Sequence, residues 1–227
     1  RYIDGGVREI IPMTIAVRNG VTDIVGICCS SLELPATDDM SNAGLAAVGL
    51  RSLTEIALNE VTYSDVEAVR SRGITCTLIA PTFNVHGATV VNPSLIEISA
   101  DYGWMRACDE MQPAVAAERA DFRRLSDLIA TLRLRCYALE CYINENAWFL
   151  MAGDAKQPVV TLRTCRWIIR ELLAKRASMG LPTHPQARRW WVGWARGFRP
   201  VGPFGTSSVW SRLAAFSNNT FPLGHAA

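Results

Sequence analysis

Asp4 and the two glycines behind it, Gly5 and Gly6, are the residues at the start of the chain that could do chemistry. Asp4 follows a short hydrophobic stretch, so it would lie where a strand ends. A carboxylate can accept a proton from a hydroxyl group, and partial burial makes it a stronger base by raising its pKa above about 3.9. The glycines would let the backbone turn sharply and leave room for a substrate. The triplet is a candidate general-base site, although Asp-Gly-Gly is also common in hairpin turns.

No serine in the sequence has the surroundings of a nucleophile elbow. Such an elbow exposes the hydroxyl on a sharp strand-to-helix turn, with glycines two positions either side of the serine. Ser207, for example, has Gly205 before it but Val209 after it. The chain also has no run of glycines that could supply the backbone donors of an oxyanion hole. A nucleophile for Asp4 would therefore have to lie outside this sequence.

The stretch that begins at Asp4 resembles the segment that follows the nucleophile in patatin-like phospholipases. The residues that carry the resemblance are Asp4-Gly5-Gly6, the run Val7 to Pro12, Ala16, Asn19-Gly20 and the apolar stretch from Asp23 to Val25. A weaker resemblance extends to about residue 113. In that family the aspartate of Asp-Gly-Gly or Asp-Gly-Ala partners a serine found earlier in the chain. The resemblance therefore implies a Ser-Asp dyad with Asp4 as general base and an acyl-serine intermediate.

The resemblance also implies a fold and a substrate. Residues 1–113 would be the C-terminal portion of an acyl hydrolase domain, an α/β three-layer sandwich with a mostly parallel sheet. The substrate would be a lipid or phospholipid carboxylic ester, and neither a cofactor nor a metal would be needed. The nucleophile and the oxyanion loop would precede Arg1, so the chain alone is expected to be inactive. The resemblance gives His86 no role.

Local signals predict alternating strands and helices in the first part of the chain. The apolar run from Ile24 to Cys29 is typical of a parallel strand that is covered on both faces. Pro12 and Asn19-Gly20 suit the two ends of a short helix. The expected helices are 13–18, 43–72 with a break near 62–64, and 101–111, and the expected strands are 23–30, 75–80 and 95–98.

Beyond Pro113 the sequence predicts a helical extension over residues 114–180. Two sets of apolar residues recur at spacings of three and four, as in a heptad seam. The first seam is Phe122, Leu125, Ile129, Leu132, Cys136, Leu139 and Ile143, and the second is Leu162, Cys165, Ile169 and Leu172. A loop over 153–158 would allow an antiparallel hairpin. The seams could pack on one another or on the α/β part, or they could bind another chain.

Residues 181–227 are expected to form an irregular tail because prolines interrupt every long element. Within it, residues 188–199 combine tryptophans with arginines, which suits contact with a membrane surface. The same tryptophans could instead be buried against the protein. These features support an alternative function, a non-enzymatic membrane-associated or partner-binding module that retains the Asp-Gly-Gly turn. A cytoplasmic or peripheral membrane location fits either function.

Charge is unevenly distributed along the chain. Up to residue 116 there are 7 basic and 14 acidic residues, and after it 16 basic and 7 acidic, so the halves carry −7 and +9. The second half could present a basic face to an anionic partner. With 21 arginines against 2 lysines, the excess can equally reflect an arginine-rich composition. We expect no nucleic-acid partner, because no recognised reading motif is present.

The seven cysteines do not form a metal-binding or disulfide pattern. The chain has no Cys-x-x-Cys pair and only three histidines, so zinc and a disulfide framework are both disfavoured. Cys28 and Cys29 are adjacent in the apolar strand pattern, where their side chains would point to opposite faces. Both are predicted to be buried thiols.

Overall fold

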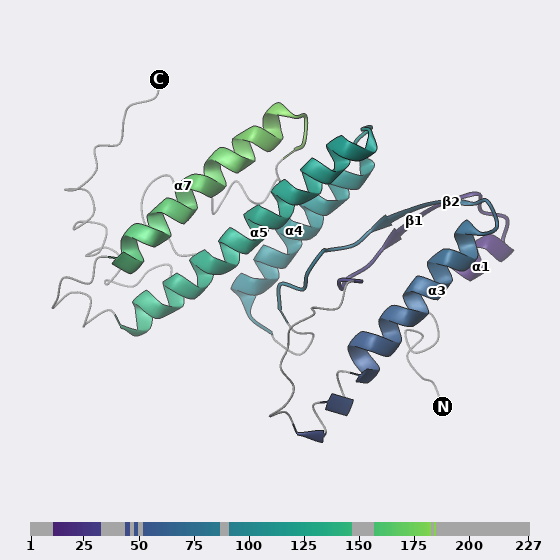
Figure 1. Ribbon diagram of the computed structural model, residues 1–227, viewed down its shortest axis with the longest axis horizontal. Coiled ribbons are helices and arrows are strands. Elements are labelled where there is room, and N and C mark those ends of the chain that lie inside the picture. The colour runs from purple at the N-terminus through teal and green to yellow at the C-terminus, as the bar shows by residue number, and fades with distance from the viewer. Residues whose placement is uncertain are drawn as a thin grey trace. The chain divides into compact units, whose positions relative to one another are not determined.

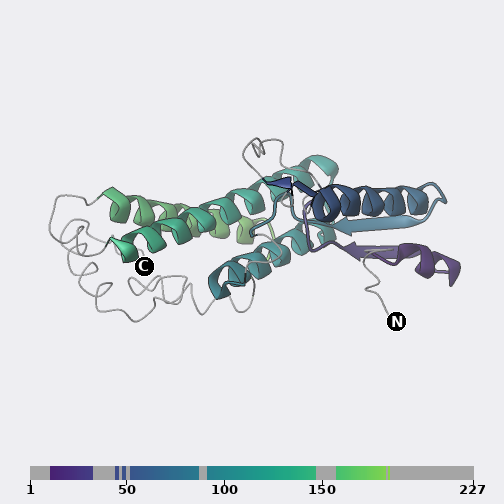
Figure 2. The ribbon, with the colours of Figure 1, turned by 90° about the horizontal axis from the view of Figure 1, so that it is seen from below.

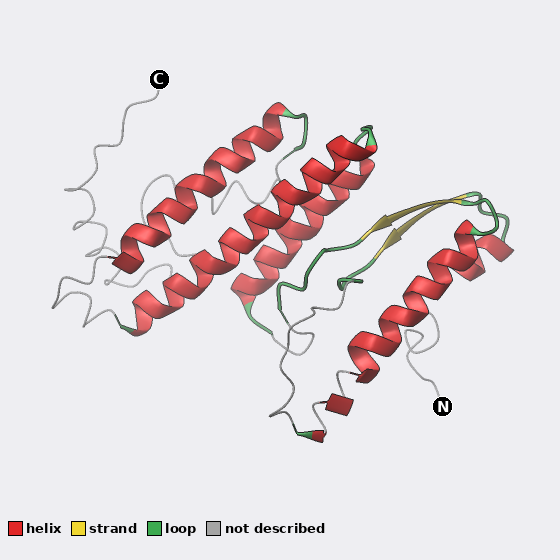
Figure 3. Cartoon of the chain, in the orientation of Figure 1, coloured by secondary structure: helices red, strands yellow, loops and turns green. Residues whose placement is uncertain are grey.

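The computed structural model of the chain describes residues 11–32, 44–45, 48–49, 52–86, 91–146, 157–182 and 184. These residues belong to two compact units that divide between Asn84 and Val85. The described part of the first unit mixes helices with two strands, and the described part of the second is helical (Figures 1 and 3). The chain is thus a mixed helix-and-strand protein with an α-helical C-terminal region.

The first unit begins with a short helix whose ends agree with the sequence signals. Helix α1 spans Met13–Arg18 and follows Pro12, which lacks the N–H that a first turn leaves unpaired. After the helix, the Asn19 side chain donates a hydrogen bond to the Ile15 carbonyl (2.8 Å). Gly20 then turns the chain with a positive φ of 82°, which glycine adopts without strain. The prediction of this helix is confirmed.

Two parallel strands form the sheet of the first unit. Strand β1 (Asp23–Ile27) pairs with β2 (Thr75–Ile79) in a register that aligns Asp23 with Thr75 and Ile27 with Ile79. The strands predicted at 23–30 and 75–80 are confirmed, although β1 ends three residues early. A π-helical segment, η2 (Ser52–Ala57), and helix α3 (Leu58–Arg70) precede β2. Figure 2 shows α3 running alongside β2.

The core of the first unit lies between the helices and one face of the sheet. Met13, Val66 and Val69 are buried there. The residues packed around them are Ile11, Val17, Ile24, Ile74, Cys76 and Leu78. Gly26 lies on this face of β1, and a Cβ atom at Gly26 would lie 3.1 Å from the Leu78 side chain. The close approach explains a glycine in the middle of the strand.

The long helix expected over 43–72 differs from the structure in the position of its break. The irregular segment is η2 at Ser52–Ala57, whereas Thr62 is buried within the regular helix α3. The Ser52 hydroxyl donates to the Val48 carbonyl four residues earlier (2.9 Å), and such bonds compete with the helical ladder. The prediction of a break near residues 62–64 is therefore wrong. Part of the expected helix, including residues 43 and 46–47, lies outside the described residues.

In the second unit, helix α4 (Pro93–Met111) replaces a predicted strand. The strand expected at residues 95–98 is wrong, because the helix already begins at Pro93. The Asn92 side chain accepts hydrogen bonds from the N–H groups of Ser94 (3.0 Å) and Leu95 (3.3 Å). An asparagine cap followed by proline at the first helical position is a strong start signal.

Helices α5 (Ala116–Glu145) and α7 (Gln157–Ser178) complete the described part of the second unit. They pack in antiparallel fashion, since Glu140 contacts Arg166 while Ser126 contacts Arg176. Most residues of the two predicted seams are buried between the helices. These buried residues are Phe122, Leu125, Ile129, Cys136, Ile143, Leu162, Cys165 and Ile169. Helix α4 packs against α5, so it lies with this helical unit rather than with the α/β part in which the sequence placed it.

Candidate functional site

The predicted site residues Asp4, Gly5 and Gly6 lie outside the described residues, and so does the segment 188–199. The description begins at Ile11, whose side chain packs against the core of the first unit. Ile11 therefore joins that core immediately before α1. The structure describes the part of the candidate site that lies at the carboxyl ends of β1 and β2.

Two loops meet at the carboxyl edge of the parallel strands, where open α/β sheets gather their functional groups. The Cys28 amide continues the ladder by donating to the Ile79 carbonyl (2.8 Å). Further on, the Ser31 amide donates to Asn84 Oδ1 (2.8 Å) and the Ser31 hydroxyl donates to the Thr82 carbonyl (2.7 Å). We refer to Ser31, Thr82 and Asn84 as the edge bracket. The bracket holds the two loops together beyond the ends of the strands.

The side chains at this edge are not activated nucleophiles. Ser31 is only 3% exposed, and its hydroxyl proton is directed to a backbone carbonyl. Burial, with smaller contributions from the neighbouring Cys29 and Cys76 thiols, raises the pKa of Cys28 to about 11. A thiol with such a pKa is protonated at neutral pH and reacts slowly. Cys29 is exposed, so the prediction that both cysteines are buried is right only for Cys28, because β1 ends before them.

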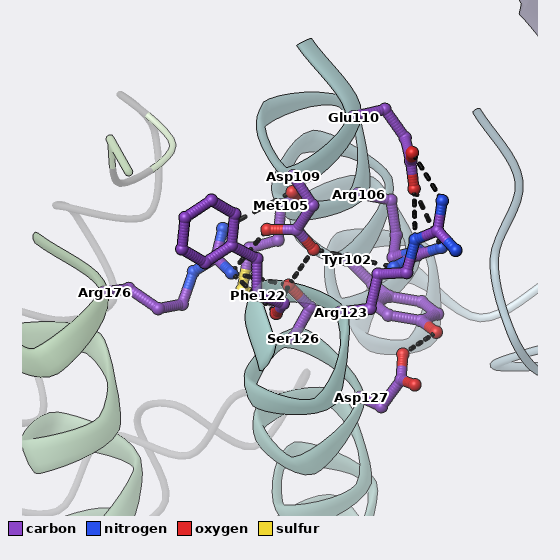
Figure 4. Close-up of polar contacts among 10 residues, drawn as sticks. All are labelled: Tyr102, Met105, Arg106, Asp109, Glu110, Phe122, Arg123, Ser126, Asp127 and Arg176. Atoms are coloured by element: carbon purple, nitrogen blue, oxygen red, sulfur yellow. Dashed lines mark hydrogen bonds and ion pairs between the residues drawn. The ribbon is translucent and has the colours of Figure 1, made fainter. Parts of the chain in front are cut away.

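A second group of polar side chains lies within the helical unit and includes a serine next to an aspartate (Figure 4). The Ser126 hydroxyl donates to Asp109 Oδ2 (2.5 Å). Arg176 Nη1 donates to Asp109 Oδ1 (2.7 Å) and to Ser126 Oγ (2.6 Å). Ser126 and Asp109 are 0% exposed and Arg176 is 1% exposed. We call these three residues the buried triplet.

The buried triplet does not have the properties of a catalytic dyad. A substrate ester cannot reach a serine that has no exposed surface. The Asp109 carboxylate is also already occupied by hydrogen bonds from the Ser126 hydroxyl and the Arg176 guanidinium. Arg176 further donates to the backbone carbonyls of Phe122 and Met105, both at 3.3 Å. Because its partners come from α4 and α5, the Arg176 side chain ties α7 to both helices.

Other ion pairs surround the triplet. Arg123 binds Glu110 through two hydrogen bonds, of 2.7 and 2.6 Å. These bonds are the main reason why the pKa of Arg123 is raised. Arg133 donates to Asp101 (2.5 Å); burial lowers the pKa of Arg133, and Asp101 opposes that shift. These pairs also join neighbouring helices, since Glu110 and Asp101 lie on α4 while Arg123 and Arg133 lie on α5.

The arginine pairs bear on the basic face expected from the charge distribution. Arg133, Arg166 and Arg176 are largely buried, and each has an acidic partner in the unit. Within the described helices, much of the arginine excess is thus used for internal pairing. A basic surface in the second half would depend on other arginines, including those of the segment 188–199.

Across the described residues, His, Cys, Asp and Glu side chains do not gather in groups of three or more that could hold a metal ion. Over the same residues, the structure shows no helix with the length and apolarity needed to cross a membrane.

No protein-family model matches the sequence, and comparisons with curated proteins and with solved structures also gave no match. The fold therefore defines the class of the chain only broadly, as a protein with a parallel α/β unit and a helical unit.

Sequence reasoning missed both the edge bracket and the buried triplet. The bracket joins residues 51 and 53 positions apart, and nothing local marks Ser31 or Asn84 as partners. The helical unit did carry a signal. Ser126, Arg133 and Glu140 recur every seven residues, next to the apolar seam, and all three are buried. Polar residues at heptad spacing beside a seam predict polar contacts inside a bundle.

Proposed function

We propose that this chain is the C-terminal part of a patatin-like lipid acyl hydrolase in which Asp4 is the general base. The observation that supports the proposal best is the order of elements behind the Asp-Gly-Gly motif. Helix α1 leads to β1, and α3 then leads to β2, which pairs in parallel with β1. A strand that ended at Asp4 and ran parallel to β1 would bring the carboxylate to the same edge as the bracket.

The proposed reaction is the hydrolysis of a carboxylic ester in a phospholipid or related glycerolipid. A serine hydroxyl from a segment before Arg1 attacks the ester carbonyl while Asp4 accepts its proton. The alcohol of the lipid leaves with that proton, and an acyl-serine ester remains. Water then attacks the acyl-serine, again with Asp4 as base, and releases the fatty acid. Gly5 and Gly6 leave space beside the carboxylate for the serine and the substrate.

Two exposed apolar side chains of β1 support the further proposal of a three-layer sandwich. Helices α1 and α3 cover one face, whereas Val25 and Ile27 on the other face are 53% and 66% exposed. Parallel sheets are normally covered on both faces, and their strands are accordingly apolar on both. We propose that additional strands and helices of the hydrolase domain cover Val25 and Ile27.

The test compares the 227-residue chain with a polypeptide extended upstream of Arg1. A fluorophosphonate probe and a short-chain nitrophenyl ester report the nucleophile and the turnover. We expect the 227-residue chain to be silent in both assays and the extended polypeptide to be positive. Asp4→Asn should reduce turnover at least a hundredfold, whereas Asp23→Asn, at the exposed start of β1, should not.

Two results would contradict the proposal. Labelling and hydrolysis by the 227-residue chain alone would show that the serine is not upstream. An active extended polypeptide that tolerates Asp4→Asn would show that Asp4 is not the base.

The alternative function, a membrane-associated or partner-binding module, depends on residues 188–199. Flotation of the full chain and of a chain truncated after His184 with anionic phosphatidylserine vesicles distinguishes it from the hydrolase. Salt-sensitive binding that truncation removes would favour a membrane module, because contact between arginine and anionic lipid weakens as salt rises. Equal flotation of the two chains would exclude the segment as an anchor.

A further inference from the structure

We propose that Ser31 and Asn84 are positioning residues for the proposed hydrolase, a role that rests on the function given above. Neither side chain has the chemistry of a nucleophile or base in this setting. Together they hold the two loops in place at the carboxyl ends of β1 and β2. A strand that ended at Asp4 and ran parallel to β1, as proposed above, would bring the carboxylate to this edge.

The bracket lies beyond the carboxyl ends of both strands. The strands themselves end at Ile27 and Ile79. The bracket joins the loops four and five residues farther along, through Ser31 and Asn84. Loops at such an edge carry functional groups in many α/β proteins, and a link between them restricts how they can move apart.

Ser31 is buried within the bracket. Both its amide and its hydroxyl donate across the two loops, and the residue is 3% exposed. Water cannot readily replace Asn84 Oδ1 as acceptor at a buried amide, so loss of this oxygen would favour rearrangement of the loop. Asn84 itself is exposed, and its replacement creates no cavity in the core.

The chemistry of a Ser-Asp dyad tolerates little displacement of the reacting groups. A Ser-Asp dyad requires the carboxylate to lie within hydrogen-bond distance of the hydroxyl, and a misplacement of about 1 Å can reduce the rate roughly a hundredfold. A bracket that keeps neighbouring loops in place would therefore act on turnover more than on substrate binding.

The experiment uses three variants of Asn84 and a matched asparagine. Asn84→Ala and Asn84→Leu remove the acceptor, and Asn84→Asp retains it. Asn19→Ala is the control, because Asn19 lies before β1 at the opposite edge of the sheet and bonds only locally to Ile15. Exchange of the Ser31 amide is measured by NMR in the 227-residue chain. The parameters kcat and KM for a nitrophenyl ester are measured in the extended polypeptide.

We expect Asn84→Ala and Asn84→Leu to accelerate exchange of the Ser31 amide at least tenfold. In the extended polypeptide, kcat should fall roughly ten- to hundredfold while KM changes less than about threefold. Asn84→Asp should restore both properties, and Asn19→Ala should alter neither. This rescue separates positioning from a general loss of stability.

The possible failures can be told apart. Faster exchange with unchanged kcat would overturn the positioning role and leave the hydrolase proposal standing. Unchanged exchange in Asn84→Ala would overturn the bracket itself. An extended polypeptide without esterase activity would overturn the proposed function, and the positioning role with it.

Discussion

Replacing Arg176 by methionine tests whether the buried triplet holds the helical unit together. Arg176 donates to Asp109, to Ser126 and to two backbone carbonyls, and it is almost fully buried. Methionine fills much of the same volume but removes the nearer of two cations beside the Asp109 carboxylate, which keeps the Arg106 guanidinium at 3.6 Å. Removing one partner of a buried ion pair typically destabilises a protein by about 3–5 kcal/mol. We expect a loss in that range.

The double variant Arg176→Met with Asp109→Leu separates the buried charge from packing. If most of the loss comes from a carboxylate that has lost its nearest cation, removing that carboxylate should recover part of the stability. The two changes should then cost at least about 1–2 kcal/mol less together than the sum of the single variants. Asp109→Leu alone should also be strongly destabilising, because it leaves the Arg176 guanidinium buried without its anion.

The assay is urea unfolding of the full chain, followed by far-ultraviolet circular dichroism. Arg170→Met is the matched control, because Arg170 lies on the same helix in an exposed pair with Glu171. Exposed pairs contribute about 0–1 kcal/mol. The reasoning would be refuted if Arg176→Met and Arg170→Met had similar midpoints, or if the double variant lost the full sum.

Three further predictions concern single positions. Ile27→Glu should change the stability of the 227-residue chain by less than about 0.5 kcal/mol, because Ile27 is 66% exposed. The same substitution should destabilise the extended hydrolase by about 2–4 kcal/mol if this face of β1 is covered there. Equal effects on the two proteins in urea unfolding would argue against a third layer. Iodoacetamide at pH 8 should modify the exposed Cys29 much faster than Cys28, because burial raises the pKa of Cys28 to about 11 and so lowers its thiolate fraction. Peptide mass spectrometry measures both modification rates, and comparable rates would contradict the burial of Cys28. Gly180→Ala should destabilise the chain by about 1 kcal/mol, because Gly180 has a φ of +78°. Gly103→Ala should stabilise the chain by a similar amount, because Gly103 lies within α4 with open space around it. Thermal unfolding of both variants measures whether stability falls in the first and rises in the second.

The elements of the first unit were largely predictable because their signals are local. Pro12 and Gly20 limit α1, and the apolar run of β1 specifies a strand, although Val25 and Ile27 are exposed rather than covered as the sequence predicted. The π-helical turn at Ser52–Ala57 was not predictable in the same way. It depends on a competition between hydrogen-bond patterns along one helix, and the residues that take part are ordinary helix formers.

Helix α4 shows how a short apolar run misleads. Residues 95–98 contain three large aliphatic side chains, which fit a strand as well as a helix. The deciding signal was the cap at Asn92 and Pro93, just before them. Once the helix begins there, Ile98, Tyr102 and Met105 fall on one buried face.

The candidate site was only partly within reach of the sequence. Asp4 could be proposed from its motif and from a family resemblance, both of which are local. The pairs Ser31 with Asn84 and Arg176 with Asp109 join residues more than fifty positions apart. Such pairs follow from the way the elements pack, so the sequence alone offers many equally reasonable partners for each group.

The polar residues inside the helical unit also bear on whether its seams bind another chain. On α5, Ser126, Arg133 and Glu140 all face inward, and their partners come from α4 and α7. A partner helix that replaced α7 would have to supply cations in place of Arg166 beside Glu140 and Arg176 beside Asp109, or remove those ion-pair partners from two buried carboxylates. Either requirement is restrictive, because removing one partner of a buried ion pair is typically more costly than losing an apolar contact. The described seams are therefore poor general docking surfaces, and a partner-binding function would have to use a different face of the unit.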